Sequence, residues 1–236
     1  MTMPRAALLA AIAMALQALS ALIATAPLVG VLLSGGSVGG PGVFLIPVQV
    51  LLFVIWSIFF LAIYREQSGT LLQFPSRRSA SILSLVLVTE YLAARISTTI
   101  FYTSWWAELR SFSGVLLVGA WLAFLTNYAG GPERPRVRTI AEILAVIVAA
   151  LGLYQSYPTL AVWARVLAPA PKDPIQAFTG GNQLQWIYHP IATAWQVVIR
   201  PGVPILVWIS ETVFLWHFSK APLNPPDSSQ TPTAPA

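Results

Sequence analysis

A run of 59 residues without Lys, Arg, Asp or Glu extends from Ala6 to Tyr64. It is broken only by a glycine-rich stretch of small residues between Ser34 and Gly42. A helix needs about 20 apolar residues to cross the hydrocarbon core of a bilayer. The run is therefore long enough for two membrane-spanning helices joined by a Gly/Pro turn, and it predicts that this part of the chain lies in lipid.

The composition of the whole chain supports the same environment. Of its 236 residues, 56% are hydrophobic and only 9% are charged, whereas a soluble domain carries roughly 25% charged residues. The formal net charge is +5, but the basic residues lie mostly at the ends of apolar segments, where they set topology. We therefore expect no nucleic-acid partner. The chain has no cysteine, which excludes disulfides, thiolate metal sites and cysteine nucleophiles.

Six apolar segments predict an all-α, polytopic bundle of about six transmembrane helices. We expect one transmembrane domain over residues 1–220, with an outer loop at 168–190 and a Pro/Ser/Thr-rich tail at 221–236. The first segment resembles a signal peptide, but its apolar run is longer than an h-region, so we expect a retained helix. The predicted spans are residues 6–33, 43–64, 79–104, 111–130, 139–166 and 191–219.

The sixth span is the least regular, because Arg200-Pro201-Gly202-Val203-Pro204 interrupts it. Proline inside a helix removes a backbone hydrogen bond and kinks the chain. The alternative is an interfacial helix over 184–199 followed by a short span over 202–219. In two of the other segments, alanines at helical spacing indicate close helix contacts: Ala7, Ala11, Ala15 and Ala18 in the first, and Ala141, Ala145 and Ala149 in the fifth.

The distribution of basic residues predicts the orientation. With the N-terminus inside, eight Lys and Arg residues lie on the cytoplasmic side and three on the other side. This bias predicts cytoplasmic termini for a multi-pass protein, which we expect in a bacterial inner membrane. The eight are Arg5, Arg65, Arg77, Arg78, Arg134, Arg136, Arg138 and Lys220, and the three are Arg110, Arg165 and Lys172.

Charged side chains within the predicted spans are the first candidate ligand-binding residues. The third span carries Glu90 and Arg95, and the sixth carries Glu211. A charge at the bilayer centre costs at least about 2.5–3.5 kcal/mol, so such groups face the bundle interior or form pairs. Two interpretations stay open: a proton or ligand site, and structural ion pairs with arginines of neighbouring helices. Glu90 and Arg95 are about 140° apart around a helix and are not expected to pair with each other.

His189 and His217 are the only histidines. Along a continuous helix they would be about 42 Å apart, so they cannot both ligate one haem. Either one could hydrogen-bond at the membrane surface or serve as the axial ligand of a haem or a chlorophyll-type magnesium. The cofactor classes that we consider are therefore a tetrapyrrole, a carotenoid or a lipid, and we expect no protein-bound metal site.

No catalytic constellation is recognisable. Ser113-Gly114 and His217 resemble the Ser/His dyad of rhomboid proteases, but Ser111 replaces the first glycine of that family's Gly-x-Ser-Gly motif. The predicted topology also places Ser113 and His217 at opposite faces of the membrane, whereas a nucleophile and its base must lie within hydrogen-bond reach. We therefore predict a protein without enzymatic activity.

Nine tryptophans are present, and Trp56 lies in the middle of the second span, where a buried indole N–H needs a partner. The sequence around it, from Pro47 through Phe53-Val54-Ile55-Trp56-Ser57 to Tyr64, resembles the start of the second helix in the translocator-protein family, also called tryptophan-rich sensory proteins. The resemblance covers about residues 26–66. Ser57 replaces the family's glycine, Pro47 is one residue too far from Phe53, and the sixth segment exceeds the family's five helices.

That resemblance implies a helical bundle that binds tetrapyrroles or sterol-like molecules in a Trp-lined cavity, with Phe53 and Trp56 among the lining residues. The sequence thus leaves two predictions of function. The first is an accessory transmembrane subunit of a larger complex, for example photosynthetic or respiratory, with a structural, assembly or pigment-contacting role. The alternative is a translocator-like protein that binds or transports a lipophilic ligand. The expected partners are membrane lipid and, for the first prediction, other membrane subunits.

Overall fold

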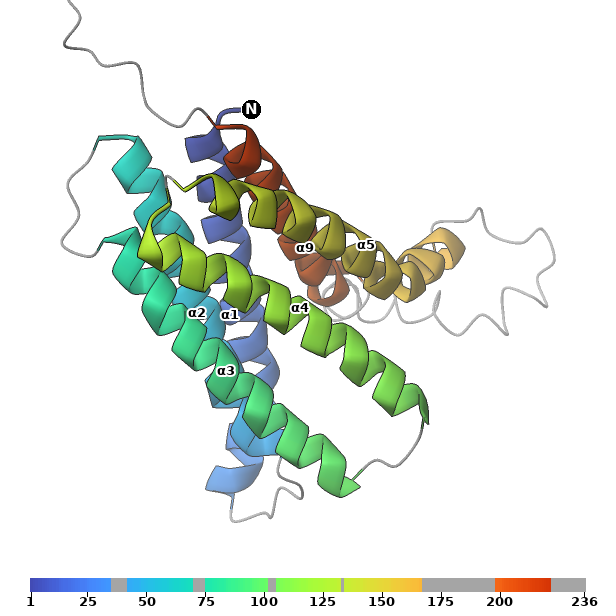
Figure 1. Cartoon of the computed structure of the whole chain (residues 1–236). Helices are drawn as coiled ribbons and strands as arrows, with labels where there is room; N and C mark the ends of the chain where they lie inside the picture. The colour runs from blue at the N-terminus through green and yellow to red at the C-terminus, as the bar shows by residue number, and fades with distance from the viewer. Residues whose placement is uncertain (35–41, 70–74, 102–104, 133, 167–197, 222–236) are drawn as a thin grey trace, which may run out of the picture.

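The computed structural model describes residues 1–34, 42–69, 75–101, 105–132, 134–166 and 198–221. In these residues every regular element is a helix, as the sequence predicts (Figure 1). The loop at 168–190, the segment 184–197 and the tail beyond Ala221 lie outside the described residues. The helices are α1 (Met3–Leu33), α2 (Gly42–Gln67), α3 (Ser76–Phe101), α4 (Trp105–Gly130), α5 (Pro135–Val166) and α9 (Arg200–Lys220).

Five of these helices are long and apolar enough to cross a membrane. This property indicates an integral, multi-pass membrane protein. α3 is not one of the five, and its side chains are described only as far as Leu92; it packs along α2 and α4 within the bundle. The five candidate spans are Met3–Ala26, Pro47–Gln67, Ser113–Gly130, Pro135–Ala161 and Arg200–Lys220.

Neighbouring helices in the chain run in opposite directions, so their ends gather at two ends of the bundle (Figure 1). One end holds the starts of α1, α3 and α5 and the ends of α2, α4 and α9, which is the upper end in the figure. The eight basic residues that the sequence assigns to one side of the membrane all belong to this end, and we call it the basic end. They are Arg5, Arg65, Arg77, Arg78, Arg134, Arg136, Arg138 and Lys220.

α5 and α9 form a closely packed antiparallel pair. At the basic end, Lys220 forms an ion pair with Glu142 at 2.9 Å. Further along, Gly152 lies so close to Trp208 that a Cβ atom on the glycine would be 2.8 Å from the Trp208 Cβ. At the other end a Cβ on Gly202 would be 3.3 Å from the Trp163 ring. Small residues thus allow the two backbones to approach, as is common between membrane helices.

The prolines of the sixth predicted span lie at the start of α9. The helix begins at Arg200, which puts Pro201 in the first turn, where the missing N–H removes no helical hydrogen bond. Pro204 follows inside the helix. α9 therefore begins close to the start of the short span, 202–219, that the sequence allows as an alternative to 191–219.

α1 packs against α2 and α9 through an alanine-rich surface. The predicted stripe is correct for Ala7, Ala11 and Ala18, which are buried, but wrong for Ala15, which is exposed. At 100° per residue, Ala15 lies about 80° from Ala7 around the helix, whereas Met14 lies within about 20° of it and takes the buried place. A second buried row runs beside the first, formed by Ala6, Ala10 and Ala13.

The contact between Gly152 and Trp208 yields the first prediction. Gly152→Ala should lower the stability by about 1–3 kcal/mol, because the new methyl group overpacks the α5–α9 contact. Gly119→Ala in α4 is the matched control: nothing lies within 4 Å of its Cβ position, and alanine favours the helix by about 1 kcal/mol. Thermal unfolding in detergent, followed by circular dichroism, compares the two. Equal melting temperatures would contradict the close α5–α9 packing.

Candidate functional site

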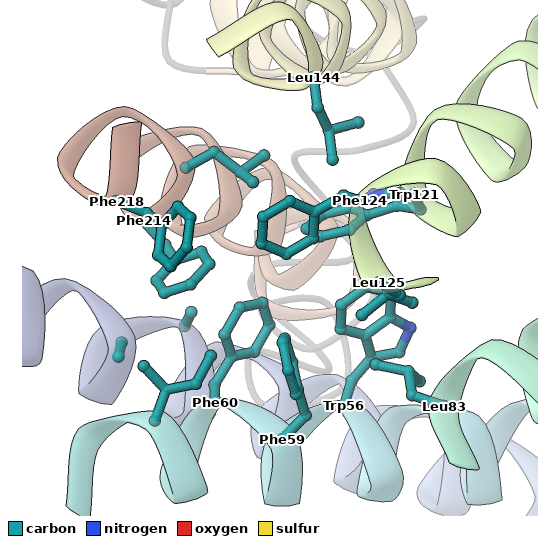
Figure 2. Close-up of a cluster of buried hydrophobic side chains, with 14 of the residues drawn as sticks. Trp56, Phe59, Phe60, Leu83, Trp121, Phe124, Leu125, Leu144, Phe214 and Phe218 are labelled. Atoms are coloured by element: carbon teal, nitrogen blue, oxygen red, sulfur yellow. The ribbon is translucent and has the colours of Figure 1, made fainter. Parts of the chain in front are cut away.

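The interior of the bundle is filled by aromatic side chains from three helices (Figure 2). Trp56 of α2 and Trp121 of α4 meet edge to face, with ring centroids 4.5 Å apart. Phe60 of α2 meets Phe214 of α9 in the same way at 4.8 Å. We call this cluster the aromatic core; its members are Trp56, Phe59, Phe60, Trp121, Phe124, Tyr128, Phe214 and Phe218.

Helical spacing explains why these rings meet. Trp121, Phe124 and Tyr128 are three and four residues apart, which places them on one face of α4. α2, α4 and α9 run in the same direction, so their aromatic faces meet over several turns: Phe124, for example, contacts Phe218 at 5.4 Å. Edge-to-face pairs of this kind contribute about 0.5–1.5 kcal/mol each beyond the area that they bury.

The family resemblance implies that Phe53 and Trp56 line a ligand cavity. In the structure, both side chains pack against other side chains of the bundle. Trp56 is only 4% exposed and stacks on Phe60, with the ring planes inclined by 22°. Its other ring neighbours include Trp121 and Phe59. Phe53 is partly buried and packs against the same hydrophobic core. The indole of Trp56 therefore packs against other rings of the protein.

A polar network joins three helices at the basic end. The Ser76 backbone N–H donates to Glu66 Oε1 at 2.6 Å, and the Ser76 hydroxyl donates to Glu66 Oε2 at 2.5 Å. The Tyr128 hydroxyl lies 2.9 Å from Ser76 Oγ. Because Ser76 opens α3, the Glu66 carboxylate lies at the positive end of that helix. Sequence reasoning missed this site: Pro75-Ser76 marks a helix start, but nothing in the sequence shows that Glu66 caps it.

The charged candidates of the third span lie near the end opposite the basic end. Glu90 is half-buried, and the Gln49 side chain of α2 forms a hydrogen bond with it. Gln49 lies close to the start of the second candidate span, Pro47–Gln67, so this pair is nearer to the membrane surface than to its centre. The Arg95 side chain lies outside the described residues.

Glu211 has a different environment. It is 5% exposed and lies halfway along α9. Among the described residues, no hydrogen bond or ion pair reaches its carboxyl group. The structure therefore does not bring Glu90 and Glu211 together, since Glu90 faces α2 near one membrane surface and Glu211 occupies the centre of the bundle.

The histidines form no joint site in the described part of the chain. His217 is half-buried one turn before the end of α9, and His189 lies outside the described residues. Ser113 belongs to the opposite end of the bundle, because it precedes Phe124 by about 16 Å along α4, while Phe124 contacts Phe218 next to His217. The described residues contain no group of three or more His, Cys, Asp or Glu side chains that could hold a metal ion.

Comparison with known proteins leaves the site to be interpreted from its own geometry. No protein-family model matches the chain, and neither the curated proteins nor the solved structures include a significant match.

The aromatic core yields the second prediction. Trp56→Ala should lower the stability by about 3–5 kcal/mol, because it removes a large buried side chain and its ring contacts. Trp216→Ala is the matched control, since Trp216 is 49% exposed on the same bundle. Unfolding by a denaturing detergent, followed by circular dichroism, measures both variants. A Trp56 variant as stable as the Trp216 variant would show that the aromatic core does not hold the bundle together.

Proposed function

We propose that this protein is a non-enzymatic accessory transmembrane subunit of a larger membrane complex, photosynthetic or respiratory in type, with a structural or assembly role. The observation that carries the proposal is the closed aromatic core. Rings of α2, α4 and α9 contact one another at centroid distances from 4.5 Å upward, so the side chains best suited to bind a flat ligand bind each other. A bundle of this kind is a rigid unit that presents its outer faces to its surroundings.

The outer face of α5 supports a role in contact with lipid and other subunits. Large apolar side chains at helical spacing project from it: Ile143, Val146, Leu153 and Leu160 are all exposed, and Tyr157 is 72% exposed. Pigments such as carotenoids or chlorophyll-type molecules could be held between such a face and a neighbouring subunit, which is the pigment-contacting form of the proposal.

We also propose that the basic end faces the cytoplasm of a bacterial cell, with both termini inside. Eight basic residues lie at this end, and cytoplasmic loops of membrane proteins carry an excess of Lys and Arg. The clustering of helix ends is consistent with this proposal, because it gathers the eight residues at one end of the bundle.

The alternative is a translocator-like protein that binds or transports a tetrapyrrole or sterol-like molecule. One observation favours it: Glu211 brings a carboxyl group into the interior at the level of the aromatic core, where a ligand could meet it. In this case Phe53, Trp56 and Glu211 would contact the ligand, with Glu90 and Arg95 nearer the surface, and His189 or His217 could ligate a tetrapyrrole metal.

The third prediction separates the two proposals. The tagged chain is extracted from its native membranes with a mild detergent and analysed by size-exclusion chromatography with absorption spectroscopy. The subunit proposal predicts co-migration with a multi-subunit or pigmented complex of constant composition, and no uptake of added porphyrin by the purified chain. A lone 25.5 kDa species that takes up porphyrin would contradict it and support the carrier.

A variant refines this test. If the chain takes up porphyrin, Trp56→Leu should weaken the affinity at least tenfold where the indole contacts the ligand, and Trp216→Leu should leave it unchanged. Titration of the tryptophan fluorescence with porphyrin measures both. An affinity that Trp56→Leu does not change would remove Trp56 from the site.

A further inference from the structure

Glu211 lies at the centre of the membrane-spanning part of the bundle. It is separated from the two ends of α9 by nine and eleven residues, or about 14 and 16 Å along the helix. Its exposed fraction is 5%, and it belongs to the buried face of α9 together with Val207, Phe214 and Leu215. A carboxyl group therefore occupies the place where an apolar side chain is expected.

The neighbouring helices offer an apolar environment at this depth. One turn beyond Glu211, Phe214 contacts Phe60 of α2 at 4.8 Å. Three residues before Phe60, Ser57 Oγ donates its proton to the Ala11 carbonyl oxygen of α1 at 2.8 Å. These contacts align Glu211 with the alanine-rich surface of α1 and with the aromatic core. Ser57 has already used its donor in the contact with Ala11.

No cation on an adjacent helix reaches this depth in the described residues. On α1, Arg5 precedes Ala11 by about 9 Å along the axis and is exposed. Arg65 of α2 and Arg138 of α5 lie at the basic end, and Lys220 is 2.9 Å from Glu142 there. The remaining described titratable groups on the helices around α9 are Tyr64 and Glu66 of α2, Tyr128 of α4 and Arg136 of α5, all toward the basic end, and Tyr154 and Tyr157 of α5, which are exposed. On α9 itself, His217 lies in the last turn and Arg200 in the first. The Arg165 side chain of α5 lies outside the described residues.

Two uncharged polar side chains of this interior are Ser210, whose hydroxyl donates to the Val207 carbonyl oxygen at 2.9 Å, and Gln17 of α1. The Gln17 Oε1 atom is buried and has no hydrogen-bond partner among the described residues. The Gln17 amide has an acceptor oxygen and an NH2 donor but no charge, so it cannot supply the positive charge that a carboxylate at Glu211 would need. Among the described residues, no hydrogen bond joins Gln17 of α1 to Glu211 of α9. The cations of these two packed helices lie toward the helix ends: Arg5, Arg200 and Lys220.

We infer that Glu211 is a proton-binding site within the membrane, at which the carboxylate takes up one proton and becomes a neutral carboxylic acid. A carboxylate without a cation or donor in hydrocarbon is far more costly than the acid, and proton uptake removes the charge without any other partner. Among the acidic side chains described, Glu66 has Ser76, Glu90 has Gln49 and Glu142 has Lys220. Glu211 alone of these four has no such partner. The inference holds for either proposed function.

The fourth prediction tests this site with dicyclohexylcarbodiimide, an apolar reagent that modifies protonated carboxyl groups in membranes. In proteoliposomes near neutral pH, peptide mass spectrometry should find the adduct on Glu211 and not on Glu142, which is exposed and ion-paired. The adduct should be lost in Glu211→Gln, kept in Glu142→Gln, and reduced as the pH is raised, since the reagent needs the protonated form. Sodium chloride at constant pH should not protect the site.

Infrared spectroscopy in D2O gives a second measurement that does not depend on reagent access. The wild-type protein should show a carboxylic-acid C=O band that disappears in Glu211→Gln and stays in Glu142→Gln. Absence of this band at neutral pH in a folded wild-type protein would overturn the inference, as would labelling of Glu142 or Glu90 in preference to Glu211. Protection by sodium would also overturn it, because the ligand would then be a metal cation.

Discussion

The packing of aromatic rings between α2, α4 and α9 is the interaction on which the rest of the bundle depends. Lipid tails are as apolar as the side chains of a neighbouring helix, so the hydrophobic effect does not drive helices together inside a membrane. Helices there associate through close packing and hydrogen bonds. Trp56 contributes through close packing: it stacks on Phe60 and meets Trp121 edge to face at 4.5 Å. Rigid rings that fit one another at these distances fix which helices are neighbours and how they are rotated.

The remaining helices attach to this core by other means, each suited to its place. α1 supplies an alanine-rich surface that lets α2 and α9 approach. α5 reaches α9 through Gly152, where Trp208 leaves no room for a side chain. At the basic end, Glu66 caps α3 and Glu142 pairs with Lys220. These charged groups lie at the end of the bundle, and most buried side chains of its interior are apolar.

Glu211 is the exception to this order, and it links the fold to function. A closed aromatic interior argues for a rigid subunit more than for a carrier, yet the same interior holds a carboxyl group that no described cation or donor contacts. The favourable contacts of Phe214 and Phe218 on the same face hold α9 in the core and keep Glu211 there. A group that is costly to bury and is retained at the membrane centre indicates a role that an apolar residue could not fill.

The sequence by itself determined the membrane environment, the helical segments and the common end of eight basic residues, because these depend on local hydropathy and on charge. It could identify Trp56 and Glu211 as residues that need partners, but only the tertiary structure decided the outcome: Trp56 has Phe60 and Trp121, Glu90 has Gln49, and Glu211 has no partner among the described residues. It also decided that Met14 replaces Ala15 in the α1 contact. The lateral order and rotation of helices depend on contacts between residues far apart in the chain, and hydropathy does not encode these contacts.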